Sequence, residues 1–333
     1  MCDDFDELNF DVLDEFERPE DVNDFLTFEN LYKDYKRIVS NPKGKSYLTN
    51  DIMYEDVLNE YNNYNNIISI CSYEELESLQ KKYIENKTIR DDKVYNELDY
   101  KFLLPNYPTK EMNEKLKNSV IEALKHVDAE KVKRNDKINS FIIGYVKVMG
   151  VVKLIDLALL LVKQGYFDNE DDALNHIKYN KFFNYYVELD VNNLVYRIEY
   201  DFDVNELINN RNNVIHFPIN EIDEDMYRTI FKNDFNINEP HVKLMVDELN
   251  KYPVLYAILK DLIFNTILCG GANETFIRKS LKRFNNEYRL KNIKKIYNII
   301  IDGINNSPSG YLYGLTFNEY KERLEKRIKE NLQ

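Results

Sequence analysis

The sequence predicts a mostly α-helical, multi-helical protein with an embedded winged helix-turn-helix-like module. Two observations lead to this fold class. Apolar residues recur at helical spacing along most of the chain. In its centre, the order of segments is helix, short strand, helix, helix and β-hairpin, which is the order of a winged helix. A hydrophobic fraction of 44% is ample for packed cores.

The length of 333 residues predicts two or three units, because one small core rarely organises so long a chain. The composition and turn signals divide it into an acidic, flexible N-terminal segment, a helical region, the winged-helix-like module and a C-terminal helical domain. We place these at residues 1–40, 45–130, 135–203 and 204–333. A net charge of −13 argues against a general polyanion binder but leaves room for a local basic face.

The cysteines predict a reducing, cytoplasmic protein. Cys2, Cys71 and Cys269 are far apart and form no Cys-x-x-Cys pair, so we expect neither a disulfide framework nor a zinc site. With only four histidines in the chain, no metal and no cofactor are expected.

The most apolar run, residues 141–162, predicts buried helices and no membrane span. Lys147, Lys153 and Asp156 interrupt it. Each charge near a bilayer centre would cost roughly 2.5–3.5 kcal/mol. No membrane partner is therefore expected.

Helix signals are clear in the first half of the chain. After a turn at residues 41–44, apolar residues recur at helical spacing from Ile52 to Tyr61. Ser72 is predicted to cap a helix with acids in its first turn, and Thr109 is predicted to cap another.

The central module is predicted segment by segment. Gly150 ends an apolar helix and is followed by the β-branched run 151–154. A helix then stops at Gly165, and a third begins at the acidic cap 168–171. Two alternating runs, 185–190 and 194–200, predict the hairpin.

The C-terminal third is predicted to be helical as well. Pro253 opens a strongly apolar helix that ends at Gly270, and Asn273 begins the next. Thr316 and Glu319 have capping-box spacing before a last amphipathic helix.

A winged helix normally inserts its third helix into the major groove and sets its hairpin against the backbone. Here the third helix and its end offer His176, Lys178 and Lys181, and the wing offers Arg197. Acidic residues surround them on both surfaces and would repel phosphate. A protein partner is therefore favoured over DNA, and DNA or RNA stays as the alternative.

A basic stripe lies in residues 278–295, with aromatic residues interleaved. Its cations are Arg278, Lys279, Lys282, Arg283, Arg289, Lys291, Lys294 and Lys295. Such a stripe could follow a nucleic-acid backbone while the aromatics stack on bases. The alternative is a solvated helix face whose aromatics point into the core.

The segment from Arg211 to His216 has the Arg-Asn-x-x-x-His spacing of the HEPN ribonucleases. In that chemistry the histidine acts as a general acid or base and the arginine stabilises developing phosphate charge. The resemblance implies a metal-independent ribonuclease that dimerises to build its site in a helical bundle. Pro218 follows closely, however, so His216 should lie at the end of any helix.

Four segments of the chain stand out together: 145–154, 211–218, 238–243 and 305–319. With them the chain resembles a loose group of uncharacterised helical proteins from low-GC Gram-positive bacteria and their phages, some of which carry a C-terminal SEC-C zinc motif. The zinc-binding cysteines of that motif are absent here. The resemblance implies an architecture and no activity.

These observations together favour a non-enzymatic binding or adaptor protein. Its partner is expected to be another protein. A DNA-binding regulator that uses the module and the basic stripe is the first alternative, and the HEPN-like ribonuclease is the second.

Overall fold

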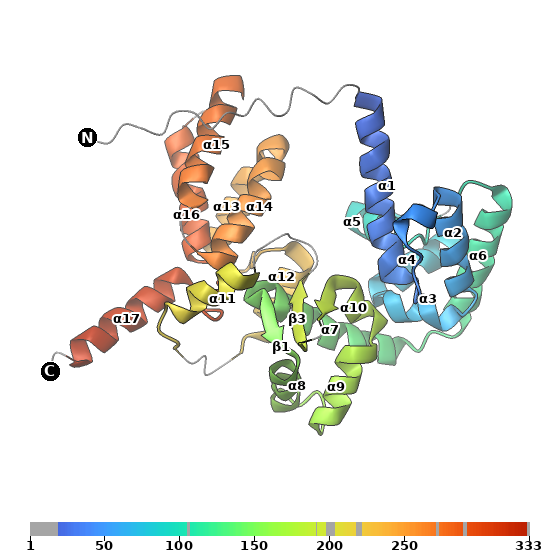
Figure 1. The fold of residues 1–333 in the computed structure, drawn as a ribbon, viewed down its shortest axis with the longest axis horizontal. Helices are drawn as coiled ribbons and strands as arrows, with labels where there is room; N and C mark the ends of the chain where they lie inside the picture. Colours follow the sequence, from blue (N-terminus) through green and yellow to red (C-terminus); the bar gives the residue numbers. More distant parts are fainter. Residues whose placement is uncertain are drawn as a thin grey trace. The chain divides into compact units, whose positions relative to one another are not determined.

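The computed structural model describes residues 19–104, 107–190, 192–197, 204–217, 222–270, 273–288 and 292–331. The described chain is mostly helical, as predicted (Figure 1). It divides into two compact units, Met1–Val127 and Asp128–Gln333. Residues 128–203 and the C-terminal region therefore belong to one unit.

The first unit is a set of helices with a 3-10 turn at Lys45–Tyr47. The helices are α1 (Pro19–Ile38), α2 (Asn50–Tyr61), α3 (Tyr64–Ile70), α4 (Tyr73–Tyr83), α5 (Asp92–Tyr100) and α6 (Lys110–Lys125). Helix α1 covers part of the segment predicted to be flexible, and its Tyr35 is fully buried. Residues 1–18 lie outside the described residues.

The predicted helix starts in this unit are confirmed by their hydrogen bonds. The Ser72 hydroxyl accepts from the Glu75 backbone N–H, while the Glu75 carboxylate accepts from the Ser72 N–H at 2.6 Å. The Thr109 hydroxyl accepts from the Met112 N–H at 3.1 Å. These side chains satisfy backbone N–H groups that the first helical turn leaves without partners.

The second unit contains the sheet and eleven further helices among the described residues. Its first part comprises α7 (Ala129–Met149), β1 (Val151–Lys153), α8 (Leu154–Lys163), α9 (Glu170–Tyr179), α10 (Lys181–Tyr186), β2 (Val187–Leu189) and β3 (Leu194–Arg197). Its second part comprises α11 (Val204–Asn212), α12 (Glu224–Asn233), α13 (Pro240–Leu249), α14 (Pro253–Cys269), α15 (Asn273–Tyr288), α16 (Ile293–Asn305) and α17 (Phe317–Asn331).

The three strands form one antiparallel sheet in the order β1-β3-β2. Val152 pairs with Val195 across β1 and β3, and Leu189 pairs with Val195 across β2 and β3. The first predicted alternating run was partly wrong, because Tyr185 and Tyr186 belong to α10 and the strand begins at Val187. Residues 198–200 of the second run lie outside the described residues.

Helix α12 packs closely along α7, which joins the predicted C-terminal region to the predicted module. Gly144 on α7 makes this approach feasible. A Cβ atom there would lie 1.9 Å from the Tyr227 carbonyl oxygen of α12. The predicted border at residue 203 therefore does not separate two packed bodies.

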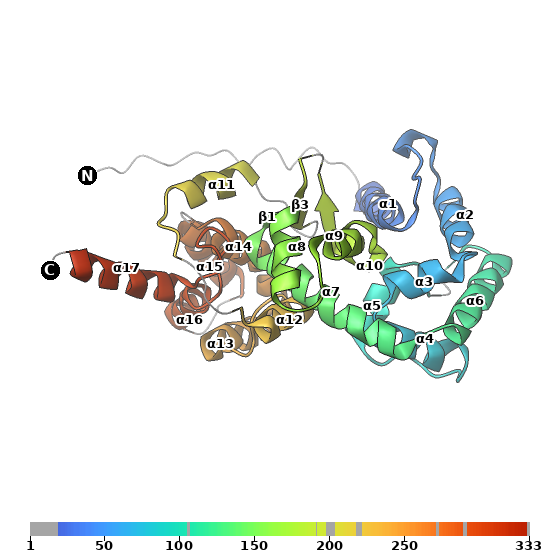
Figure 2. The same cartoon turned by 90° about the horizontal axis from the view of Figure 1, so that it is seen from below.

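Helices α13 to α16 share a core of aliphatic and aromatic side chains, among them Met245, Leu259, Leu281 and Ile300. Both views draw these helices together, and α17 projects from them (Figures 1 and 2). In the described ranges, no helix combines the length and the apolar character needed to cross a membrane.

Candidate functional site

The first candidate is Arg211, and the structure ties its guanidinium to backbone. Its Nε donates to the Gly310 carbonyl at 2.9 Å and one Nη donates to the Val151 carbonyl at 3.1 Å. The other Nη donates to the Met149 carbonyl. Met149 ends α7, where carbonyl groups lack helical partners and carry partial negative charge. Arg211 therefore fastens the end of α7, β1 and the turn at Gly310 to α11.

His216 lies beyond the end of α11, as its closeness to Pro218 predicted; Pro218 itself is outside the described residues. The His216 side chain is exposed, and its ring centroid lies 4.5 Å from that of Tyr313. The Arg211 guanidinium lies 5.4 Å from the same Tyr313 centroid. The two motif residues thus meet at one aromatic ring. Three of the five N–H groups of the Arg211 guanidinium nevertheless donate hydrogen bonds to backbone carbonyls.

The second candidate is the surface of α9 and the hairpin. The acids in the first turn of α9, Glu170, Asp171 and Asp172, are all exposed. Lys178 is exposed near the end of that helix, whereas Lys181 is half-buried in α10. Arg197 belongs to β3, but its side chain lies outside the described part of the chain.

His176 on α9 does not point freely to solvent. Its Nε2 lies 3.0 Å from Asn139 Oδ1 and 3.1 Å from Asn180 Nδ2. Burial, together with the positive charge of Arg134, lowers the pKa of His176 to about 4. The imidazole is therefore neutral at pH 7 and offers no charge to a phosphate.

Helix α8 presents a feature that the sequence analysis missed. The apolar run 141–162 was predicted to be buried helices, yet Ile155 and Leu159 on α8 are 42% and 44% exposed. They lie one helical turn apart and so share a face. Leu157 and Leu161 on the other side are fully buried. The helix is apolar on both sides, so periodicity could not show which side faces the core.

The third candidate is the basic stripe, now divided between α15 and α16. Its described cations are all exposed: Arg278, Lys279, Lys282, Arg283, Lys294 and Lys295. Arg289 and Lys291 lie outside the described residues. Phe284 is buried and Tyr297 is half-buried. Arg278 donates to the Tyr297 hydroxyl at 3.3 Å, and its guanidinium lies 5.0 Å from the Tyr297 ring centroid.

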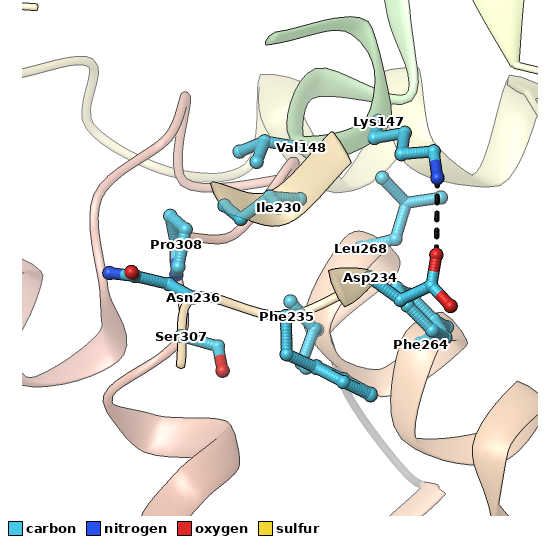
Figure 3. A pocket seen from close by; sticks show the side chains of 11 residues that line it. Lys147, Val148, Ile230, Asp234, Phe235, Asn236, Phe264, Leu268, Ser307 and Pro308 are labelled. Carbon is cyan, nitrogen blue, oxygen red and sulfur yellow. Dashed lines mark hydrogen bonds and ion pairs between the residues drawn. The ribbon is translucent and has the colours of Figure 1, made fainter. Parts of the chain in front are cut away.

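A fourth feature is a small pocket between α7, the residues after α12, and α14 (Figure 3). Its lining is mostly apolar, but the buried Lys147 donates to Asp234 at 3.1 Å at one end. Lys260 donates to the other Asp234 oxygen at 2.8 Å. At another point on its wall, the buried Asn236 Oδ1 accepts no hydrogen bond from the described residues.

Asp234 is held ionised by its two lysines. Burial alone would raise its pKa, but the charges of Lys147 and Lys260 outweigh burial and lower the pKa to about 2. In the sequence, Lys147 stands out only as a charge inside an apolar run. Its partner lies 87 residues further along the chain. No local pattern could have identified that ion pair.

Within the described ranges, no group of three or more histidine, cysteine, aspartate or glutamate side chains is arranged to hold a metal ion. Comparison with known proteins adds no relative: no family model matches the chain, and neither the curated proteins nor the solved structures contain a match.

Proposed function

We propose that this protein is a non-enzymatic binding protein that uses a winged-helix-like module, residues 129–197, to contact a protein partner. The order of elements from α7 to β3 supports the module, as does the pairing of β1 with the hairpin strand β3. Helix α10 is an addition to that order, because it stands between the third helix and the hairpin.

The observation that carries the choice of partner is the exposed apolar pair Ile155 and Leu159 on α8, which lies within the module. Removing apolar surface from water contributes about 25 cal/mol per Å², so such a pair favours contact with another apolar surface. The exposed acids that open α9 would repel phosphate at the position where a DNA-reading helix needs cations.

Affinity capture with matched variants tests this proposal. The variant Ile155→Asp/Leu159→Asp should lose the co-purifying partner that the unaltered chain retains. Val254→Asp/Ile258→Asp on α14 is the matched control, because these residues are 55% and 52% exposed and are also four residues apart. Circular dichroism of both variants checks their folding. An identical set of captured proteins for all three chains would refute the proposal.

DNA binding is the second candidate function, and the exposed cations of α15 and α16 favour it. A DNA-binding regulator should shift labelled duplex DNA in a salt-sensitive manner. Charge reversal at Lys282, Arg283 and Lys294 should weaken that shift.

The ribonuclease hypothesis is tested by incubating the protein with labelled RNA without added metal and following cleavage of that RNA. Arg211→Ala and His216→Ala should each abolish cleavage if the pair is catalytic. The three carbonyl contacts of Arg211 favour a structural role instead.

A further inference from the structure

Helices α15 and α16 carry a concentration of positive charge that is unusual for this chain. We define the basic face as Arg278, Lys279, Lys282, Arg283, Lys294 and Lys295, all of which are exposed. The whole chain has 58 acidic and 45 basic residues. Acidic partners are thus abundant, yet Lys279, Lys282, Lys294 and Lys295 form no ion pair with any described residue. Their charges remain available to a polyanion.

Arg278 adds a planar group to this face. Its guanidinium lies against the Tyr297 ring and is fixed by the hydrogen bond to the Tyr297 hydroxyl. Because Arg278 is exposed, the guanidinium also contacts solvent. Guanidinium planes of this kind stack on unpaired nucleobases. Tyr297 therefore holds the Arg278 guanidinium beside its ring, while Arg278 stays exposed to a ligand.

A surface hollow runs along α16 beside Tyr297. Lys294, Lys295, Tyr297, Asn298 and Asn305 contribute to its wall. The amide side chains can donate to and accept from base edges. Asp302 also lies there, and its carboxylate is 2.8 Å from Nδ1 of His241.

We propose that the basic face binds single-stranded nucleic acid. The lysines contact phosphates, a base stacks on Arg278, and the asparagine amides contact base edges. A duplex buries the faces of its bases within its own stack, so this combination selects a single strand. The proposal does not depend on the protein-binding function of α8.

Fluorescence anisotropy of the full-length protein with a labelled 16-nucleotide oligouridylate tests the lysines. The variant Lys279→Gln/Lys282→Gln/Lys294→Gln/Lys295→Gln should bind at least about 10-fold more weakly at low salt. Its slope of log affinity against log salt should be shallower by about 3, given roughly 0.7 per phosphate contact on single strands.

The matched control is Lys243→Gln/Lys321→Gln/Lys326→Gln/Lys329→Gln, which removes four exposed lysines on α13 and α17. It changes the net charge equally, so it should keep the affinity within about 3-fold if location matters. An equal loss of affinity in both variants would mean that only the overall charge matters, and it would overturn the proposal. Absence of binding by the unaltered chain at low salt would overturn it as well.

Arg278→Lys tests the stacking, because it keeps the charge and removes the plane. It should weaken oligouridylate binding by about 5- to 10-fold, in the range of one stacked base. It should leave binding of inorganic polyphosphate unchanged, because polyphosphate has no bases. Equal affinity for a 16-base-pair duplex and the single strand, or an unchanged affinity of Arg278→Lys, would contradict the single-stranded assignment.

Discussion

Two regions of the second unit use positive charge in opposite ways. Around the end of α7, Arg211 and Lys147 are withdrawn from solvent, and each is bound to fixed oxygen atoms of the protein. On α15, Lys279 and Lys282 are exposed and form no ion pair with any described residue. In the first region the cations stabilise the fold, and in the second they remain accessible to a ligand.

The difference follows from the cost of burial. An unpaired charge inside a protein is strongly destabilising, so a buried cation must have oxygen partners in the folded state. Exposed cations keep their hydration and need no partner. A motif such as Arg-Asn-x-x-x-His therefore cannot be assigned from spacing alone. The burial and the partners of its arginine decide between a structural and a catalytic role.

The largest effect is expected for Arg211→Ala. It removes the hydrogen bonds to the carbonyls of Gly310, Val151 and Met149 and leaves these acceptors poorly satisfied. We expect the free energy of unfolding to fall by about 3–5 kcal/mol. Urea denaturation followed by circular dichroism measures it.

Arg327→Ala provides the comparison, because Arg327 is exposed on α17 and should contribute little. His216→Ala should also be close to neutral, since the imidazole is exposed. Unchanged stability of Arg211→Ala would break the contrast between the two regions and return Arg211 to the list of candidate catalytic groups.

A second, smaller effect is expected where α7 meets α12. Gly144→Ala would place a Cβ 1.9 Å from the Tyr227 carbonyl oxygen, so the helices must separate. We expect a loss of about 3 kcal/mol. Gly165→Ala is the control: its φ is +74° but nothing lies within 4 Å of an added Cβ. Backbone strain alone should cost about 1 kcal/mol. Equal thermal shifts for the two variants would contradict the close packing.

Local features of the fold were predictable from the sequence. Ser72 caps its helix as predicted, Thr316 and Glu319 form the predicted capping box, and Gly150 and Gly270 end their helices with positive φ. Each of these features depends on side chains within a few residues of the backbone that they serve. Neighbouring residues therefore carry enough information to identify them.

The features that depend on distant residues were not predictable. The approach of Gly144 to Tyr227 and the contact of Lys147 with Asp234 join residues more than 80 positions apart. The exposure of Ile155 depends on what packs against the other side of α8. The sequence indicates which residue types form the candidate sites. Only the fold shows which of these residues are buried and which groups they contact.

The ion pair of Asp234 with its two lysines predicts a third effect, on pH dependence. The folded-state pKa of about 2 is below the ordinary value of 3.8 for an unfolded chain. The ionised carboxylate therefore stabilises the fold above about pH 4, and this contribution is lost as the pH falls towards 2. The difference is about 2 kcal/mol.

Asp234→Asn isolates this contribution. The difference in unfolding free energy between the unaltered chain and this variant should shrink as the pH falls from 4 to 2, measured by urea denaturation at each pH. A difference that stays constant over this range would mean that the lysines do not hold the carboxylate ionised.

The smallest stability effect is expected on the basic face, where the fourfold lysine-to-glutamine variant of α15 and α16 removes charges that the fold does not use. Each substitution should alter the free energy of unfolding by no more than about 0.5 kcal/mol. Relief of repulsion between Lys279 and Lys282, which are three residues apart on α15, acts in the stabilising direction. The urea midpoint should therefore match that of the unaltered chain even where nucleic-acid binding is lost. A clear drop in that midpoint would show that these lysines support the helices. They would then differ from Arg211 only in how much they stabilise the fold.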